Sequence, residues 1–165
     1  MSEHDLHQKA KANFAIIIVS DTRDEKTDES GKIAKKLILS EGHQVLAYKI
    51  ISNNKALIQT TMKEMFQNPK INVIVTSGGT GISKRDITVD AVSELLDKKI
   101  EGFGELFRKL SYEEIGEAAM ISRAIAGAVN GKLVFSLPGS QNAVKLALSK
   151  LILPGIGHIL KEANR

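Results

Sequence analysis

Apolar residues follow two alternating patterns along the chain. Short, nearly unbroken apolar runs, which are typical of strands covered on both faces, occupy residues 14–19, 45–51, 71–75 and 133–137. Between these runs, apolar residues recur at helical spacing. The helical stretches begin near residues 28, 54, 89, 105 and 144, and the fourth of them is expected to extend over 105–129.

This alternation predicts an α/β fold: a three-layer, doubly wound, mostly parallel sheet with helices on both faces. The chain has 165 residues, which fits one domain. We expect residues 1–11, which are mostly polar, to form a disordered N-terminal tail. Residues 12–165 are then expected to form the single domain.

Helix ends carry local signals. Gly42 is a plausible C-cap of the first helix, and Asn53 or Asn54 can cap the second. Pro154 and Gly155 predict a kink or a break in the last helix.

Four predicted loops share one chemistry. They follow the carboxyl ends of the four predicted strands, at residues 20–23, 52–54, 77–86 and 138–140, and they are rich in Gly, Ser, Thr, Asp and Asn. In doubly wound folds, ligands bind at the carboxyl edge of the sheet, near the switch in strand order. The sequence therefore predicts one composite site built from these loops.

The loop from Ser77 through Gly78, Gly79 and Thr80 to Gly81 is the strongest candidate for binding an anion. Glycines permit positive φ angles and let backbone N–H groups face a ligand. The alternative is a tight turn without a ligand. The spacing fits neither the Walker A loop nor the dinucleotide-binding fingerprint, so we expect a phosphate-bearing small molecule of another kind.

Several charged residues lie in the predicted loops. Asp86 either caps the following helix or binds Mg²⁺ together with the phosphates of a substrate. Arg85 could pair with phosphate or face water. Asp21 could hold a hydroxyl group or a metal-bound water, whereas Asp28 could be only a helix cap.

Composition excludes several kinds of catalytic site. The chain has no cysteine, so it can have no disulfide, thiolate metal site or cysteine nucleophile. Its four histidines are isolated, which argues against a histidine metal site. No Ser-His-Asp set can be assembled on the loop edge.

The charge and hydropathy of the chain argue against nucleic-acid and membrane partners. The net charge of +4 is mild, Lys and Arg are scattered among acids, and aromatic residues make up 4% without Trp. This pattern argues against a nucleic-acid partner.

The N-terminus has acids and no apolar core, unlike a secretory signal, and the run 14–19 is far shorter than the roughly 20 residues that span a bilayer. We expect a cytoplasmic protein without a membrane partner.

At this point the loops resemble those of a known family. The ordered set of motifs, at residues 19–23, 76–88, 101–104, 122–124 and 137–140, is similar to that of the MoaB/MogA family of molybdenum cofactor biosynthesis. The resemblance covers about residues 12–160, and the segment 101–116 is more similar to the MoaB branch.

The resemblance implies an activity. Active members transfer AMP from Mg-ATP to the terminal phosphate of molybdopterin and release pyrophosphate. It also implies a homotrimer or a homohexamer. Because related domains occur in MoeA-like and gephyrin-type proteins, it implies a molybdenum-insertion partner of the MoeA type.

The resemblance also assigns roles to residues. Asp86 would be catalytic and would lie at the Mg²⁺ and the nucleotide phosphates. The pterin and its phosphate would be held by Ser77, Gly78, Gly79, Thr80 and Gly81, and the site would be closed by Pro138, Gly139 and Ser140. The nucleotide side would be lined by Ser20, Asp21 and Thr22.

One position departs from the family pattern. Active members usually have an Asp that is needed for metal-assisted transfer between the second strand and its helix, and the residue at this catalytic position here is Asn53. An amide oxygen binds Mg²⁺ more weakly than a carboxylate. Three hypotheses follow: an adenylyltransferase that tolerates Asn53, a molybdopterin-binding protein with weak or no catalysis, and an interaction scaffold without a pterin ligand.

Overall fold

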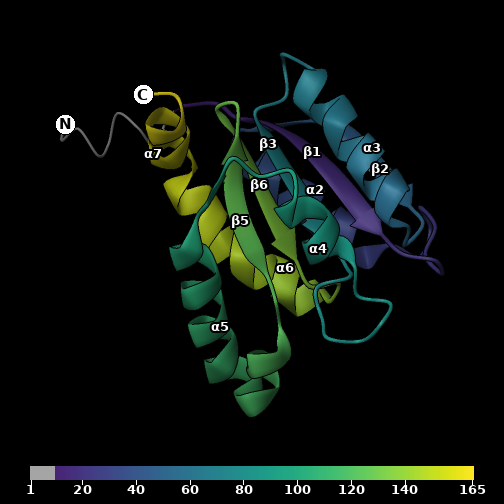
Figure 1. The fold of residues 1–165 in the computed structure, drawn as a ribbon. Helices are drawn as coiled ribbons and strands as arrows, with labels where there is room; N and C mark the ends of the chain where they lie inside the picture. Colours follow the sequence, from purple (N-terminus) through teal and green to yellow (C-terminus); the bar gives the residue numbers. More distant parts are fainter. Residues whose placement is uncertain (1–9) are drawn as a thin grey trace.

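Six strands form one mixed sheet in the order β2-β1-β3-β6-β5-β4 in the computed structural model, which describes residues 10–165 (Figure 1). The strands are β1 (Asn13–Val19), β2 (Gln44–Ile51), β3 (Val73–Ser77), β4 (Lys98–Lys99), β5 (Ile125–Val129) and β6 (Lys132–Leu137). β2, β1, β3 and β6 are mutually parallel, whereas β5 is antiparallel to both neighbours. Residues 1–9, most of the expected tail, lie outside the described residues.

Helices cover both faces of this sheet, as the alternating pattern predicts. They are α2 (Glu29–Ser40), α3 (Lys55–Gln67), α4 (Thr88–Ser93), α5 (Glu101–Ile115), the 3₁₀ turn η1 (Gly116–Ile121), α6 (Gln141–Ala147), the π-helical turn η2 (Leu148–Ile152) and α7 (Leu153–Ala163). One buried cluster joins the sheet to α2, α5, α6 and α7, and a second joins it to α3 and α4. The three-layer α/β prediction is therefore confirmed.

Strand β1 shows why its apolar run is unbroken. Phe14, Ile16 and Ile18 belong to the first buried cluster, whereas Ala15 and Ile17 belong to the second. Successive strand side chains point to opposite faces of a sheet. Because both faces of β1 are covered, every buried position from Phe14 to Val19 is apolar.

The expectation of a helix over 105–129 is wrong at its C-terminal end. Residues 125–129 form β5, which pairs with β6 through a two-residue turn at Asn130 and Gly131. Both turn residues have positive φ, +48° and +78°. An Asn-Gly pair between apolar runs is a strong hairpin signal, and here it outweighs the four-residue spacing of Ile121, Ile125 and Val129, which favours a helix.

Most of the cap predictions are confirmed. Asp28 accepts a hydrogen bond from the Gly31 N–H at the start of α2, and Gly42, with a φ of +82°, follows the end of that helix. Of the two candidate asparagines, Asn54 caps α3, where its side chain accepts from the Leu57 N–H.

The last helix contains no break. The π-helical turn η2 lies directly before Pro154, and the chain is helical from Gln141 to Ala163. A π turn shifts the hydrogen-bond register where a proline supplies no N–H. This helix is long and apolar enough to cross a bilayer by length and composition alone. Because Val144, Leu148 and Ile152 are buried in the first cluster, we attribute its apolar character to core packing.

Candidate functional site

The four strand-end loops meet at one edge of the sheet. The Ser20 N–H donates to the Ile51 carbonyl at 2.9 Å and joins the ends of β1 and β2. At β3 and β6, the Gly78 N–H donates to the Leu137 carbonyl at 2.9 Å. The parallel strands thus place all four loops at the same edge of the sheet.

Gly78 and Gly79 must be glycines. Their φ angles are +105° and +75°, which L-residues rarely adopt. A Cβ on Gly78 would lie 2.4 Å from the Val19 carbonyl oxygen, and one on Gly79 would lie 2.2 Å from Oγ1 of Thr88. The loop therefore packs its backbone directly on β1 and on the start of α4.

The carbonyl groups of this loop are held by Thr88 and Arg123. The Gly79 carbonyl accepts from the Thr88 N–H at 3.1 Å, and the Thr80 carbonyl accepts from the Arg123 N–H at 2.8 Å. The Gly81 carbonyl accepts from Nε of Arg123 at 2.7 Å. In a trans peptide the next N–H points the opposite way, so the N–H groups of Thr80 and Ile82 point away from these donors. Within residues 10–165, neither N–H has a hydrogen-bond acceptor.

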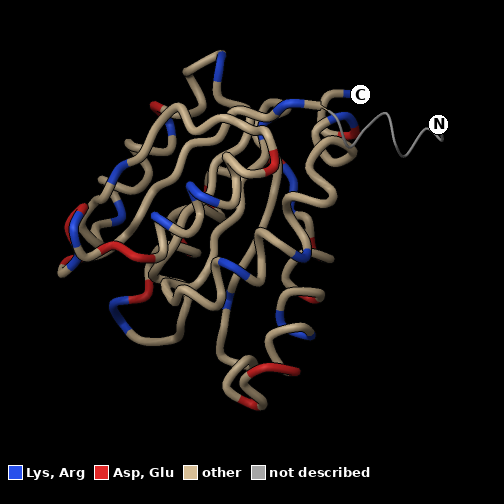
Figure 2. Tube along the Cα trace, turned by 180° about the vertical axis from the view of Figure 1, so that it is seen from behind, with Lys and Arg blue, Asp and Glu red and all other residues tan. Residues whose placement is uncertain are grey.

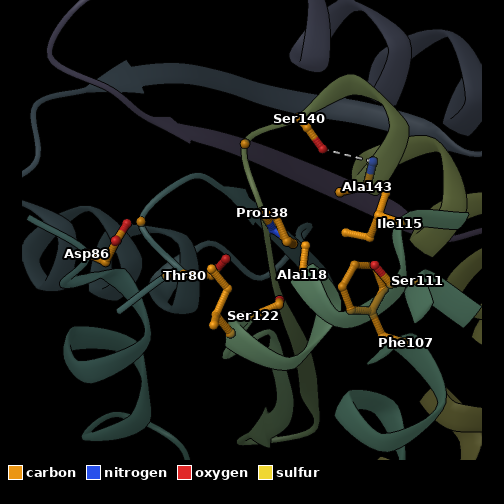
Figure 3. Close-up of a pocket in the computed structure, with 14 residues that line it drawn as sticks. Thr80, Asp86, Phe107, Ser111, Ile115, Ala118, Ser122, Pro138, Ser140 and Ala143 are labelled. Carbon is orange, nitrogen blue, oxygen red and sulfur yellow. Dashed lines mark hydrogen bonds between the residues drawn. The ribbon is translucent and has the colours of Figure 1, made fainter. Parts of the chain in front are cut away.

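A cavity of about 270 Å³ opens beside the Gly-rich loop. It is lined by Gly79, Thr80, Gly81, Asp86, Phe107, Ser111, Ile115, Ala118, Ile121, Ser122, Pro138, Gly139, Ser140 and Ala143. Figure 3 shows Asp86 at one end and Phe107, Ser111 and Ile115 at the other, with Thr80 between them. The cavity therefore has a polar end on the loop and an apolar end on α5 and η1.

Asp86 stabilises the loop that follows the glycines. One of its carboxylate oxygens accepts from the Ser83 N–H at 2.9 Å and from the Ser83 hydroxyl at 2.7 Å. The hydroxyl bond is the largest influence lowering the pKa of Asp86, and the backbone N–H groups of Ser83 and Gly81 and the charge of Arg123 act in the same direction. The alternative in which Asp86 caps α4 is wrong, because α4 has no side-chain cap.

Asn53 ties two loops together. Its backbone N–H donates to the Asp21 carboxylate at 2.8 Å, and its side-chain NH₂ donates to the Arg85 carbonyl. Its side-chain oxygen is buried and has no hydrogen-bond partner among the described residues. This amide therefore holds the segment before Asp86 against the end of β2.

The residues predicted for the site fall into two groups. Gly79, Thr80, Gly81, Asp86 and residues 138–140 line the cavity. The second group lies outside the cavity lining and consists of Ser20, Asp21, Thr22, Asn53, Ser77 and Gly78. Two of these serve the fold directly, because the Ser77 hydroxyl donates to the Pro138 carbonyl at 3.1 Å and the Gly78 N–H is bonded to Leu137.

The sequence analysis did not predict the residues of the apolar cavity wall or the contacts that Arg123 makes with the Gly-rich loop. Phe107, Ser111 and Ile115 recur every four residues on α5, and a buried serine within an apolar helical stripe is the signal that could have identified them. Arg123 lies in the motif at residues 122–124, for which the sequence predicts no separate role, although its guanidinium donates to the carbonyls of Gly81 and Asp86.

The site has few groups that could hold a metal by themselves. Asp86 is the one carboxylate that lines the cavity among the described residues. Across residues 10–165 there is no group of three or more His, Cys, Asp or Glu side chains placed to bind a metal. Basic and acidic residues are interspersed over residues 10–165, where they form no continuous basic stripe (Figure 2).

Known proteins resemble this chain over nearly its whole length. The chain is 48% identical over 166 residues to molybdenum cofactor biosynthesis protein B of Bacillus cereus, with 100% of this chain and 98% of that protein covered. A crystal structure of a molybdenum cofactor biosynthesis protein B is 50% identical, with a TM-score of 0.92 and coverage of 94% and 98%. The tungsten cofactor synthesizing protein MoaB from Pyrococcus furiosus is 40% identical, with a TM-score of 0.85 and the same coverage.

The family model described as a probable molybdopterin binding domain matches residues 15–158, nearly all of the described chain. Together with the full-length relatives, this match shows that the chain belongs to the MoCF_biosynth family of molybdenum cofactor biosynthesis proteins.

Proposed function

We propose that this protein acts in molybdenum cofactor biosynthesis by transferring AMP from Mg-ATP to the terminal phosphate of molybdopterin, with release of pyrophosphate. The observation that carries the proposal is the cavity that runs from Gly79, Thr80 and Gly81 of the Gly-rich loop to an apolar wall. The names of the relatives support the pathway, and the geometry of the site supports the kind of ligand.

The two ends of the cavity suit the two ends of a phosphorylated pterin. Backbone N–H groups at glycines are good phosphate donors because no side chain blocks them. At the other end, Phe107, Ile115 and Pro138 offer apolar surface to a flat ring, and the buried hydroxyls of Thr80 and Ser111 can hydrogen-bond to its polar edge.

The transfer itself needs no nucleophilic side chain. A phosphate oxygen of the pterin substrate attacks the α-phosphorus of ATP, the bond between the α-phosphorus and the bridging oxygen breaks, and pyrophosphate leaves. Such reactions depend mostly on positioning and on charge neutralisation. We assign positioning of the accepting phosphate to the N–H groups of Thr80 and Ile82, and the nucleotide side to Ser20, Asp21 and Thr22.

Asp86 fits a divalent cation that arrives with the nucleotide. A single carboxylate is too little for an all-protein metal site, but Mg²⁺ is usually held by one or two carboxylates together with substrate phosphates. The lowered pKa of Asp86 keeps its carboxylate charged at neutral pH. When bound there, Mg²⁺ would neutralise the charge of the phosphates.

The engaged amide of Asn53 favours a second candidate, a molybdopterin-binding protein with little or no transfer activity. Its NH₂ group already has an acceptor in Arg85, and its oxygen is neutral. In this role the side chain orders the loop before Asp86 without taking part in metal binding.

Pyrophosphate release from Mg-ATP and purified molybdopterin separates the candidates when wild type is measured beside Asn53→Asp. Wild-type turnover supports the transferase. Pterin binding without turnover in either variant supports the binding protein. A silent wild type with an active Asn53→Asp would place the loss of chemistry at this one position. If calorimetry detects neither pterin nor ATP binding, both candidates are overturned.

We further propose that the protein is a cytoplasmic homotrimer or homohexamer that passes its product to a molybdenum-insertion partner of the MoeA type. Large apolar side chains are exposed on α5 and η1, namely Leu106, Tyr112, Ile115, Met120 and Ile121. Large apolar side chains exposed on two consecutive elements are typical of protein interfaces. A second copy of the chain is the partner we assign to it.

A further inference from the structure

One arginine connects three segments of the site. Nε of Arg123 donates to the Gly81 carbonyl at 2.7 Å, and Nη2 donates to the Asp86 carbonyl at 2.8 Å. Nη1 and Nη2 also bind the two carboxylate oxygens of Asp90 on α4, at 3.0 and 3.1 Å. Arg123 thus joins the Gly-rich loop, the segment before α4, and α4 itself.

The backbone of the same residue adds a fourth contact. Its N–H donates to the Thr80 carbonyl at 2.8 Å, so that Arg123 holds the carbonyls of two consecutive loop residues. Fixing these carbonyls fixes the opposite orientation of the Gly81 and Ile82 N–H groups, because each peptide unit is planar and trans. The Gly81 N–H faces the Asp86 carboxylate, and the Ile82 N–H has no acceptor within residues 10–165.

We infer that Arg123 is the positioning residue of the Gly-rich loop: it holds the carbonyls of Thr80 and Gly81 and so presents the N–H groups of Ile82 and Gly81 to the ligand and to Asp86. The use made of those N–H groups rests on the proposed function, whereas the positioning belongs to the free protein. The residue lines no part of the cavity itself and acts through the loop.

Lysine cannot replace this arrangement. Arginine presents five donors in a rigid plane, and Arg123 uses three of its nitrogens in different directions at once. A lysine ammonium keeps the positive charge near Asp90 but cannot reach the Gly81 and Asp86 carbonyls together. Arg123→Lys therefore separates positioning from charge.

Arg108 supplies a matched control. Its Nη1 donates to the carbonyls of Ser122 and Ala124, at 3.3 and 3.1 Å, on either side of Arg123. Arg108→Lys disturbs the same chain segment from its other side but touches no atom of the Gly-rich loop. An effect confined to Arg123→Lys cannot come from general loosening of residues 122–124.

The test uses the full-length free protein and two NMR measurements. The first is hydrogen exchange of the Thr88 amide, which donates to the Gly79 carbonyl, and the second is the backbone amide chemical shifts of Gly81 and Ile82, whose peptide carbonyls Arg123 holds. We expect Arg123→Lys to speed this exchange about tenfold or more, the effect of losing a charged hydrogen bond, and to shift both amide resonances. Arg108→Lys should change neither quantity, and amides of β3 should be protected in all three proteins.

The inference is overturned if Arg123→Lys leaves both quantities at their wild-type values, or if Arg108→Lys changes them equally. Calorimetric titration with Mg-pyrophosphate is run on the same samples. A wild type that binds no pyrophosphate would count against the proposed function, whereas the exchange and chemical-shift results would still decide the role of Arg123.

Discussion

The hydroxyl of Tyr48 on β2 donates a hydrogen bond to the fully buried carboxylate of Asp28, which also caps α2. A buried carboxylate that loses a donor is destabilising by about 1–3 kcal/mol. We therefore expect Tyr48→Phe to lower the free energy of unfolding by this amount in urea titrations. Tyr112→Phe, at a side chain that is 63% exposed, should have no measurable effect.

The same pair predicts alkaline sensitivity. Burial, and secondly the hydrogen bond to Asp28, raise the pKa of Tyr48 above its ordinary value of 10.0. Above this pH the unfolded chain loses the phenol proton while the folded chain retains it, so stability falls as the pH rises. Unfolding titrations above pH 10 should show a decline that Tyr48→Phe reduces, and an unchanged decline would contradict the assignment.

His43 predicts a loss of stability in acid. Its Nδ1 accepts from the Ala12 N–H at 3.0 Å, and burial lowers its pKa below 6.5. The unfolded chain then binds a proton that the folded chain excludes, so stability should fall as the pH drops below about 6.5, by up to about 1.4 kcal/mol per pH unit. His43→Asn retains an acceptor without titrating and should flatten this part of the profile. Equal slopes for both proteins would exclude His43 as the cause.

Gly79→Ala should damage the loop. The substitution introduces a Cβ at a φ of +75°, 2.2 Å from Oγ1 of Thr88. Strain alone costs about 1–2 kcal/mol, and the clash shifts the N–H groups. We expect lower stability and loss of Mg-pyrophosphate binding. Gly102→Ala in α5, where no atom lies within 4 Å of an added Cβ, should instead stabilise by up to about 1 kcal/mol.

Asn53→Asp should make stability depend on Mg²⁺. The carboxylate cannot donate to the Arg85 carbonyl, so the protein without metal should lose about 1–3 kcal/mol. If a cation binds between the introduced carboxylate and the Arg85 carbonyl oxygen, thermal shift assays should show that Mg²⁺ recovers part of the lost stability. Asn54→Ala, which removes the α3 cap, should cost about 1 kcal/mol irrespective of Mg²⁺. The same Mg²⁺ response in both variants would contradict the idea.

The exposed apolar side chains of α5 and η1 predict the assembly surface. Light scattering of the wild type should give three or six times the chain mass of 17.9 kDa. Met120→Glu, at a side chain that is 78% exposed, should reduce this mass. Leu46→Glu on β2, at a position that is 43% exposed, serves as the control and should not. A monomeric wild type would overturn the oligomer proposal.

Local patterns in the sequence predicted most of the fold. The main wrong prediction, a helix at residues 125–129, has a physical cause. The buried strands were recognisable because strands covered on both faces require continuous apolar runs. Residues 125–129 were misjudged because Ile121, Ile125 and Val129 recur at helical spacing, whereas the pairing of β5 with β6 decides their conformation. The Asn130-Gly131 turn was the local evidence for that pairing.

From the sequence alone we predicted that the Gly-rich loop, Asp86 and residues 138–140 lie together, and residues 79–81, Asp86 and residues 138–140 do line one cavity. This prediction was possible because glycine, short polar residues and strand ends act over a few neighbouring positions. Only the tertiary structure revealed that Ser77 and the Gly78 N–H serve the fold, that Asn53 binds the Arg85 carbonyl, and that Arg123 binds the carbonyls of Thr80 and Gly81. These roles depend on hydrogen bonds between residues distant in the chain. The geometry of such bonds is set by how the sheet and helices pack, which no local pattern records.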